Sequence, residues 1–106
     1  MQKFKPLGPF QSRGPSDYVC SRVLLANVAE RVTVPSTANF VVISGTSNLY
    51  VSFGGGGVTA AVPTDLDDGT ASELNGASYY IDPATYTNIS VISAVDSIAT
   101  LAFYQV

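Results

Sequence analysis

The chain has 106 residues, the length of one ordinary domain, so we expect a single folded core. Charged residues make up 12% of the chain and hydrophobic residues 46%, a balance typical of a folded protein and not of a disordered one. The net charge is −3, His and Trp are absent, and Cys20 stands alone, so the usual general base, metal ligand and disulfide framework are missing. These absences exclude most enzyme classes, and we expect neither a cofactor nor a metal.

Residues 1–16 differ in composition from the rest of the chain. Three prolines and two glycines interrupt this segment and prevent a regular helix or strand, which predicts an extended N-terminal arm able to reach about 50 Å. The arm has charge +3, whereas the remainder has two arginines against eight acids, a net −6. A frayed terminus is the alternative, but we favour an arm that docks on a neighbouring protein. The partner-binding candidates are three basic and three apolar residues: Lys3, Lys5, Arg13, Phe4, Leu7 and Phe10.

From Asp17 onward, short runs rich in Val, Ile, Thr, Tyr and Phe alternate with Gly, Asn, Asp, Ser and Pro. This spacing is typical of a β-sandwich or β-barrel, so residues 17–106 are predicted to form one all-β domain without a helix. The predicted strands are Tyr18–Ala26, Arg31–Val34, Asn39–Ser44, Leu49–Phe53, Ser78–Ile81, Ile89–Ala94 and Ile98–Tyr104.

Alternation within these strands predicts which side chains are buried. The residues expected in the core are Val32, Val34, Leu49, Val51, Phe53, Leu101 and Phe103, and Cys20 is expected to act as a small buried hydrophobic residue. Tyr104 is expected to present a polar tip at an edge or interface. Between Ile89 and Val95 both faces are partly apolar, which indicates a strand enclosed by the partner sheet on one side and by a loop or a second subunit on the other.

Short connections at Ser44–Asn48 and Asp96–Ser97 predict that consecutive strands pair as hairpins. The exception is the long segment from Gly54 to Leu74, whose length is typical of a functional or mobile loop. We treat this segment as a second place where a partner binds, with candidate contacts at Gly55, Gly56, Asp65, Asp67, Tyr79 and Tyr80.

Several patterns suggest chemistry that the surrounding residues do not support. The glycine run 54–57 is not followed by the Lys and Ser/Thr of a phosphate-binding loop, so a flexible loop is the better interpretation. Asp65, Asp67 and Asp68 offer carboxylates to a hard cation, but their spacing fails the EF-hand pattern, and a solvated acidic turn closed by Gly69 is favoured. Paired acids for glycoside hydrolysis are conceivable among Glu73, Asp82 and Asp96, although nothing in the sequence sets their separation.

Tyr79, Tyr80 and Tyr86 lie close together in the sequence and suggest stacking on sugar rings, with cross-strand packing or an interface as the alternative. Nucleic acid is not an expected partner, because the acidic body lacks clustered basic residues. Membrane insertion is not expected either, because no apolar run approaches about 20 residues, and the first ten residues lack the apolar region of a secretory signal.

The order of several strand patterns carries a resemblance to a known class of proteins. The order begins with residues 30–35 (Glu-Arg-Val-Thr-Val-Pro), 39–44 (Asn-Phe-Val-Val-Ile-Ser) and 48–54 (Asn-Leu-Tyr-Val-Ser-Phe-Gly). A Gly/Ala/Asp-rich insert, an aromatic strand, residues 87–93 (Thr-Asn-Ile-Ser-Val-Ile-Ser) and a closing strand follow, and the whole resembles the small β-sandwich virion proteins of tailed bacteriophages. The resemblance covers about three quarters of the chain, from Glu30 to Tyr104, and concerns core strands instead of an active site.

The resemblance implies an antiparallel β-sandwich or jelly roll of about seven or eight short strands with a structural role. Such proteins decorate or cement the capsid, or belong to the tail, usually as symmetric oligomers. The first hypothesis is therefore a non-enzymatic decoration protein, a homotrimer made in the host cytoplasm that binds the major capsid protein at the capsid surface. The second is a tail-associated or host-recognition module that binds glycans through Tyr79, Tyr80, Tyr86 and the loop 54–74.

Overall fold

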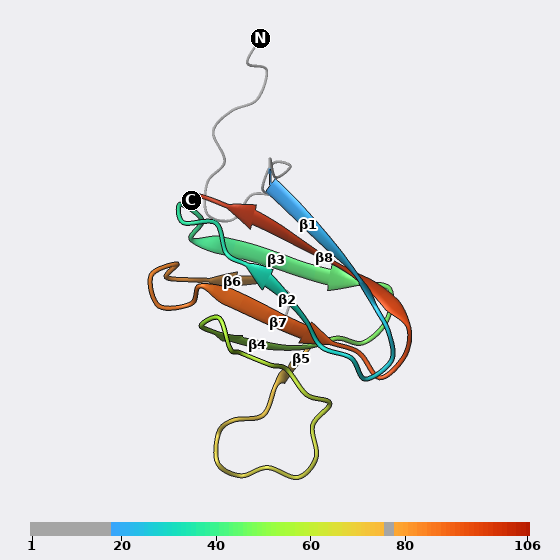
Figure 1. Cartoon of the computed structure of the whole chain (residues 1–106). Helices are drawn as coiled ribbons and strands as arrows, with labels where there is room; N and C mark the ends of the chain where they lie inside the picture. The colour runs from blue at the N-terminus through green and yellow to red at the C-terminus, as the bar shows by residue number, and fades with distance from the viewer. Residues whose placement is uncertain (1–17, 76–77) are drawn as a thin grey trace.

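The computed structural model describes residues 18–75 and 78–106, which form two four-stranded antiparallel sheets (Figure 1). The first sheet has the order β1-β8-β3-β6 and the second the order β2-β7-β4-β5. The strands are β1 (Tyr18–Leu24), β2 (Glu30–Thr33), β3 (Phe40–Gly45), β4 (Tyr50–Gly54), β5 (Glu73–Leu74), β6 (Ser78–Tyr80), β7 (Asn88–Ile92) and β8 (Ser97–Tyr104).

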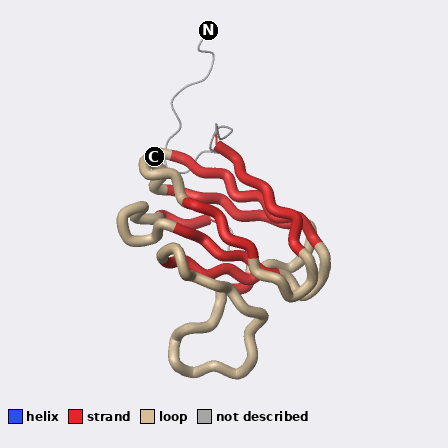
Figure 2. The backbone as a smooth tube through the Cα atoms, in the orientation of Figure 1, coloured by secondary structure: helices blue, strands red, loops and turns tan. Residues whose placement is uncertain are grey.

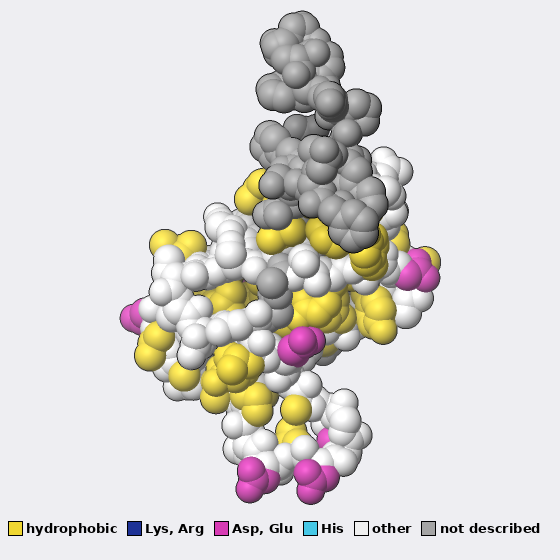
Figure 3. Space-filling model, turned by 180° about the vertical axis from the view of Figure 1, so that it is seen from behind, with side chains coloured by type: hydrophobic (Ala, Val, Ile, Leu, Met, Phe, Trp, Pro, Cys, Tyr) yellow, Lys and Arg dark blue, Asp and Glu magenta, His cyan; other side chains and the backbone are white. Residues whose placement is uncertain are grey.

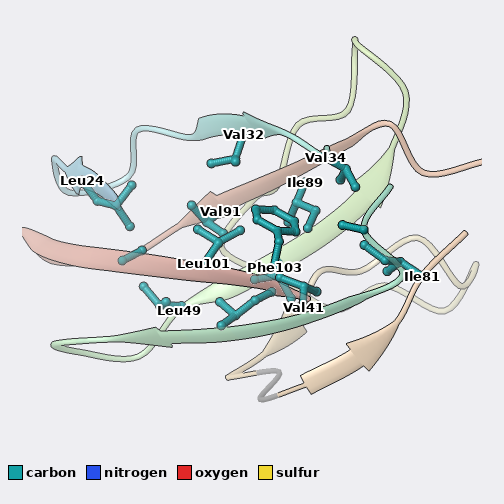
Figure 4. Packing of buried hydrophobic residues seen from close by; sticks show 14 residues of the cluster. Leu24, Val32, Val34, Val41, Leu49, Ile81, Ile89, Val91, Leu101 and Phe103 are labelled. Atoms are coloured by element: carbon teal, nitrogen blue, oxygen red, sulfur yellow. The ribbon is translucent and has the colours of Figure 1, made fainter. Parts of the chain in front are cut away.

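The two sheets pack face to face as a β-sandwich around one core (Figures 2 and 4). Val41 of β3 and Leu101 of β8 point inward from the first sheet, and Val32 of β2 and Val91 of β7 point inward from the second. All four side chains are almost completely buried. Because alternate residues of a strand face opposite sides of its sheet, one apolar residue in every two is enough to build this core.

The predicted strands agree closely with the observed ones. All seven occur, with bounds that differ by two residues or fewer, and β5 is an additional strand of two residues that the sequence pattern did not indicate. No helix occurs among the described residues, as predicted. None of the described segments therefore offers a helix that is long and apolar enough to cross a membrane.

The core predictions are also largely confirmed. Six of the seven residues expected in the core are buried, whereas Phe53 is only half-buried and packs against the cluster from its margin. Cys20 occupies a similar position, half-buried against the core and not fully enclosed.

The prediction that consecutive strands pair as hairpins is wrong. Among the described strands, β4 and β5 are the sole consecutive pair joined in a ladder, and they flank the long loop 55–72 that was taken as the exception. Every other connection crosses from one sheet to the other. A short turn fixes how tightly the chain reverses, but not whether the next strand joins the same sheet or the facing one.

Hydrogen bonds join the crossing connections at one end of the sandwich. In the β7–β8 connection, Ser93 is buried and donates its hydroxyl to the carbonyl of Asn48 in the β3–β4 connection, at 2.9 Å. The Asn27 N–H donates to the Ser93 carbonyl at 2.7 Å, and Asn27 has φ 63°, a left-handed conformation that Asn tolerates. Three connections are thus bonded to one another instead of each closing its own hairpin.

Candidate functional site

The arm candidates Lys3, Phe4, Lys5, Leu7, Phe10 and Arg13 lie outside the described residues. The loop 55–72 is described throughout, and its far part projects from the sandwich (Figures 1 and 2). Residues 64–71 are all exposed, whereas Ala60 is buried. The loop therefore has two parts, one packed on the body and one in solvent.

A row of polar side chains fixes the packed part of the loop to the outer face of the second sheet. Ladder register places Arg31 of β2, Ser90 of β7 and Ser52 of β4 side by side across this face. The buried hydroxyl of Ser90 accepts the Ala60 N–H at 2.8 Å, and Arg31 donates to the Val58 carbonyl and to the Thr59 hydroxyl.

Ser72, just before β5, extends the row. Its hydroxyl accepts the Ala61 N–H at 3.2 Å and lies 2.6 Å from the hydroxyl of Ser52. We name Arg31, Ser52, Ser72 and Ser90 the serine–arginine row. The row provides hydrogen-bond partners for the Val58 carbonyl and for the N–H groups of Ala60 and Ala61 on a sheet face that would otherwise be open. A buried N–H left without a partner would cost about 1–3 kcal/mol of stability.

The serine–arginine row decides which of the two enclosures expected for β7 is present in this chain. Ile89 and Val91 face the core, while Ser90 and Ile92 face outward and are buried as well. The bond from Ala60 to Ser90 places the loop over this outer face. The cover is therefore a loop of the same chain. The sequence signal was the buried-looking serine within an apolar strand, which needs a hydrogen-bond partner.

The glycine run leads into the packed part. Gly55 and Gly56 are exposed, and a Cβ atom at either position would meet no atom within 4 Å, so packing does not require glycine there. At Gly54 a Cβ atom would lie 3.1 Å from Cβ of Val58. A side chain would therefore be crowded at Gly54, at the end of β4, but not at Gly55 or Gly56.

The exposed tip of the loop carries the acidic candidates. Figure 3 shows acidic side chains gathered on the projecting loop. Asp65 and Asp67 are exposed. Asp68 accepts hydrogen bonds from the hydroxyl of Thr70 at 2.6 Å and from its N–H at 3.1 Å, and the pKa of Asp68 is lowered mainly by these bonds. Within residues 18–75 and 78–106, no three carboxylate, Cys or His side chains are grouped to hold a metal ion.

A cavity of about 230 Å³ lies between the edge strands of the two sheets. Phe53 of β4 lines it, and Tyr79 of β6 and Tyr86 of the β6–β7 connection meet the Phe53 ring edge-on, with ring centroids 4.7 Å and 5.9 Å away. Glu73 of β5 adds a carboxylate. The cavity is lined by Phe53, Glu73, Tyr79, Tyr80, Ile81 and Tyr86, and we call it the aromatic cavity.

The Tyr79 hydroxyl is the most perturbed group of the aromatic cavity. Its oxygen is buried and completes no hydrogen bond with the described residues. Burial, and secondly the nearby Glu73 carboxylate, raise the pKa of Tyr79 to about 12. The carboxylate is close enough to oppose the phenolate charge, but it does not reach hydrogen-bond geometry. The phenol therefore stays neutral and is not suited to act as a base near neutral pH.

The structure separates the tyrosines that the sequence suggested as one cluster. Tyr79 and Tyr86 contact Phe53. Tyr80 also lines the cavity, but its ring packs on Phe40, with centroids 4.9 Å apart, on the outer face of the first sheet. The sequence pattern predicts Phe53 in the core and offers Glu73 only as one of a pair of catalytic acids, so it does not place either residue beside the tyrosines. No pattern in the sequence indicates that β5 and β6 lie on the same side of the molecule.

The acids considered for glycoside hydrolysis are engaged separately. Asp82 accepts the Ala84 N–H and the Thr85 hydroxyl, both at 3.0 Å. Asp96 accepts the Ala26 N–H at 2.8 Å. Asp82 thus stabilises its own turn, whereas Asp96 joins the β7–β8 connection to the β1–β2 connection. Of the three acids, Glu73 alone lines the aromatic cavity.

Comparison with known proteins found no matching family model, no matching curated protein and no matching solved structure. The resemblance to phage virion proteins therefore remains a prediction from the sequence pattern.

Proposed function

We propose that this chain is a structural, non-enzymatic protein of a phage virion, a decoration or cement protein at the capsid surface. In this proposal residues 17–106 form the body, and residues 1–16 form an arm that binds the major capsid protein and neighbouring copies. The assembly is a homo-oligomer, a trimer by the resemblance noted above, and it uses no cofactor, nucleic acid or membrane.

The observation that carries the proposal is the strand order, β1-β8-β3-β6 facing β2-β7-β4-β5. With connections that cross between the sheets, this order supports an eight-stranded jelly roll, an architecture used by viral capsid proteins and by lectins. Architecture alone does not assign a function, so the surfaces must distinguish these two uses.

Two features favour a structural role over catalysis. The sequence has no His, and the two acids nearest a catalytic pattern, Asp82 and Asp96, hold turns. The charge of the chain is also divided, with +3 on residues 1–16 and −6 on the remainder. Opposite charges of this kind steer an arm toward the acidic surface of another copy, while its apolar side chains supply buried area.

The arm is tested in the full chain by two triple variants. The first replaces Phe4, Leu7 and Phe10 by Ser, and the second replaces Lys3, Lys5 and Arg13 by Ser. We expect the first to lose binding to capsids prepared without the protein, and the second to bind more slowly with a weaker salt dependence. The measurement is the number of copies bound per particle, followed over time and at several salt concentrations. Undiminished occupancy by both variants would show that the arm has no role.

A second candidate function, glycan binding by a tail-associated or host-recognition module, is favoured by the aromatic cavity. Aromatic rings beside a carboxylate suit a sugar, whose apolar face stacks on a ring and whose hydroxyls bond to the acid. Saturable binding of glycans or host cells that Tyr86→Ala abolishes would support this candidate. Few copies per virion in a mass-spectrometric count would point to the tail, whereas many copies would point to the capsid.

A further inference from the structure

The outer face of the first sheet is uncharged over its whole described extent. Ladder register arranges its side chains in rows that cross the strands. These rows are Val23 and Ile98; Ser21, Thr100 and Ser44; Val19, Ala102, Val42 and Ser78; and Tyr104, Phe40 and Tyr80. We name these twelve residues the uncharged face.

Large apolar side chains on the uncharged face are open to solvent. Val23 is 72% exposed, Val19 58% and Ile98 47%. At the other margin Tyr80 is 80% exposed, although its ring packs on Phe40. The polar residues between them are small, and the hydroxyls of Ser44 and Thr100 lie 2.9 Å apart. Apolar patches of this kind on a folded protein indicate an interaction site.

The outer face of the second sheet, on the opposite side of the sandwich, is not exposed in the same way. There the serine–arginine row holds residues 58–61 over the second sheet, and Ser90 and Ile92 are buried. One sheet is thus covered by the chain's own loop. The other presents Val, Ile, Phe and Tyr residues to solvent with none of the charges that commonly protect an open sheet.

We infer that the uncharged face is the contact between copies of this chain. The residues after the arm carry a net −6, so two bodies repel each other where their acids meet. A face without acids lets two bodies approach and bury apolar area without that cost. The arm is the less suitable occupant, because its three cations would find no carboxylate among these twelve residues.

The size of the face indicates how strong this contact is. Strands about 4.8 Å apart with about 3.4 Å per residue give the face a footprint of roughly 400 Å². A standard interface uses about 800 Å² per partner. We therefore expect reversible association that depends on concentration and that the fixed spacing of copies on a shell would strengthen.

Sedimentation of the purified full chain tests the inference with two matched double variants. The first, Val23→Lys with Ile98→Lys, places two charges in one row of the uncharged face. The control, Leu66→Lys with Leu74→Lys, adds the same charge at side chains that are 47% and 51% exposed on the loop tip and on β5. We expect the wild type and the control to associate as concentration rises, and the first variant to associate at least about 100-fold more weakly.

Circular dichroism and thermal unfolding establish that both variants are folded before they are compared. A wild type that stays monomeric at millimolar concentration would overturn the inference, and so would equal association of the two folded variants. The inference names the copy-to-copy contact of the proposed homo-oligomer, but the assay contains no capsid. Loss of capsid binding with normal self-association would therefore reject the decoration proposal and leave this contact intact.

Discussion

Tyr79 and Tyr80 show how one step along a strand changes the chemistry of a residue. Tyr79 points inward beside Val41 and reaches Phe53, where burial and Glu73 raise the pKa of its phenol. Tyr80 points to the outer face of the same sheet and is 80% exposed. The ring of Tyr79 packs on Phe53 in the aromatic cavity, whereas the ring of Tyr80, which also lines the cavity, packs on Phe40 in the uncharged face. The two rings differ because a strand alternates its side chains between the two faces.

The raised pKa of Tyr79 predicts a dependence of stability on pH. A phenol that ionises near pH 10 when unfolded and near 12 when folded binds more protons in the folded state between these values. Its contribution to stability is complete below pH 10 and is lost as the pH rises toward 12. Tyr79→Phe keeps the ring contact with Phe53, so we expect a shallower decline in the free energy of unfolding. Urea unfolding at a series of alkaline pH values is the measurement, and identical slopes would contradict the assignment.

At the scale of elements, β7 depends on a loop that is distant in the sequence. Its inward residues Ile89 and Val91 contribute to the core, and its outward Ser90 anchors Ala60, 30 residues earlier. The strand is thus stabilised on one side by burial of apolar area and on the other by a satisfied hydrogen bond. The loop needs that bond, because the buried backbone of Ala60 is not part of a ladder.

Ser90→Ala should release the packed part of the loop. The buried Ala60 N–H would lose its partner, and we expect the free energy of unfolding to fall by about 1–3 kcal/mol. Hydrogen exchange should accelerate at residues 58–61 and remain slow in β7. The matched control is Ser44→Ala, which removes an exposed hydroxyl bonded to Thr100 and should change stability by less than about 0.5 kcal/mol. Unchanged exchange at residues 58–61 would show that Ser90 does not hold the loop.

At the scale of the whole molecule, the crossing connections make the two sheets interdependent. The eight strands alternate between the sheets from β1 to β4 and again from β5 to β8, so neither sheet consists of a continuous piece of chain. Leu101 and Val41 from one sheet share a core with Val91 and Val32 from the other. The sandwich should therefore unfold as one cooperative unit, since exposing either inner face exposes both.

Leu101→Ala tests this cooperativity. Leu101 is fully buried in β8, the strand between β1 and β3, and its truncation should cost about 2–5 kcal/mol. Urea unfolding followed by circular dichroism and by tyrosine fluorescence should give one shifted transition with both probes. Leu66→Ala, at a half-exposed residue of the loop tip, should leave the transition in place. Two separate transitions would contradict a shared core.

Local rules predicted much of the fold. The inward positions of Val32, Val51 and Leu101 follow from alternation alone, because the direction of a side chain along a strand depends on its parity. The partners of each strand do not follow, and the short turn at Ser44–Asn48 was wrongly taken as a hairpin. The candidate site was predicted less well: the aromatic cavity needs Phe53 and Glu73, which lie on strands that meet the tyrosines only after both sheets have formed.

The sequence by itself determined the all-β class, the position of nearly every strand, the inward phase of the core and the division of charge between residues 1–16 and the acidic remainder. These properties are local or additive, so they can be counted along the chain. The tertiary structure alone decided which strands pair, that residues 58–61 cover β7, that Tyr79 and Tyr80 serve different surfaces, and that the first sheet keeps an uncharged face. Each of these depends on contacts between distant segments, whose choice of partner is set by packing of the whole chain and not by any neighbouring residues.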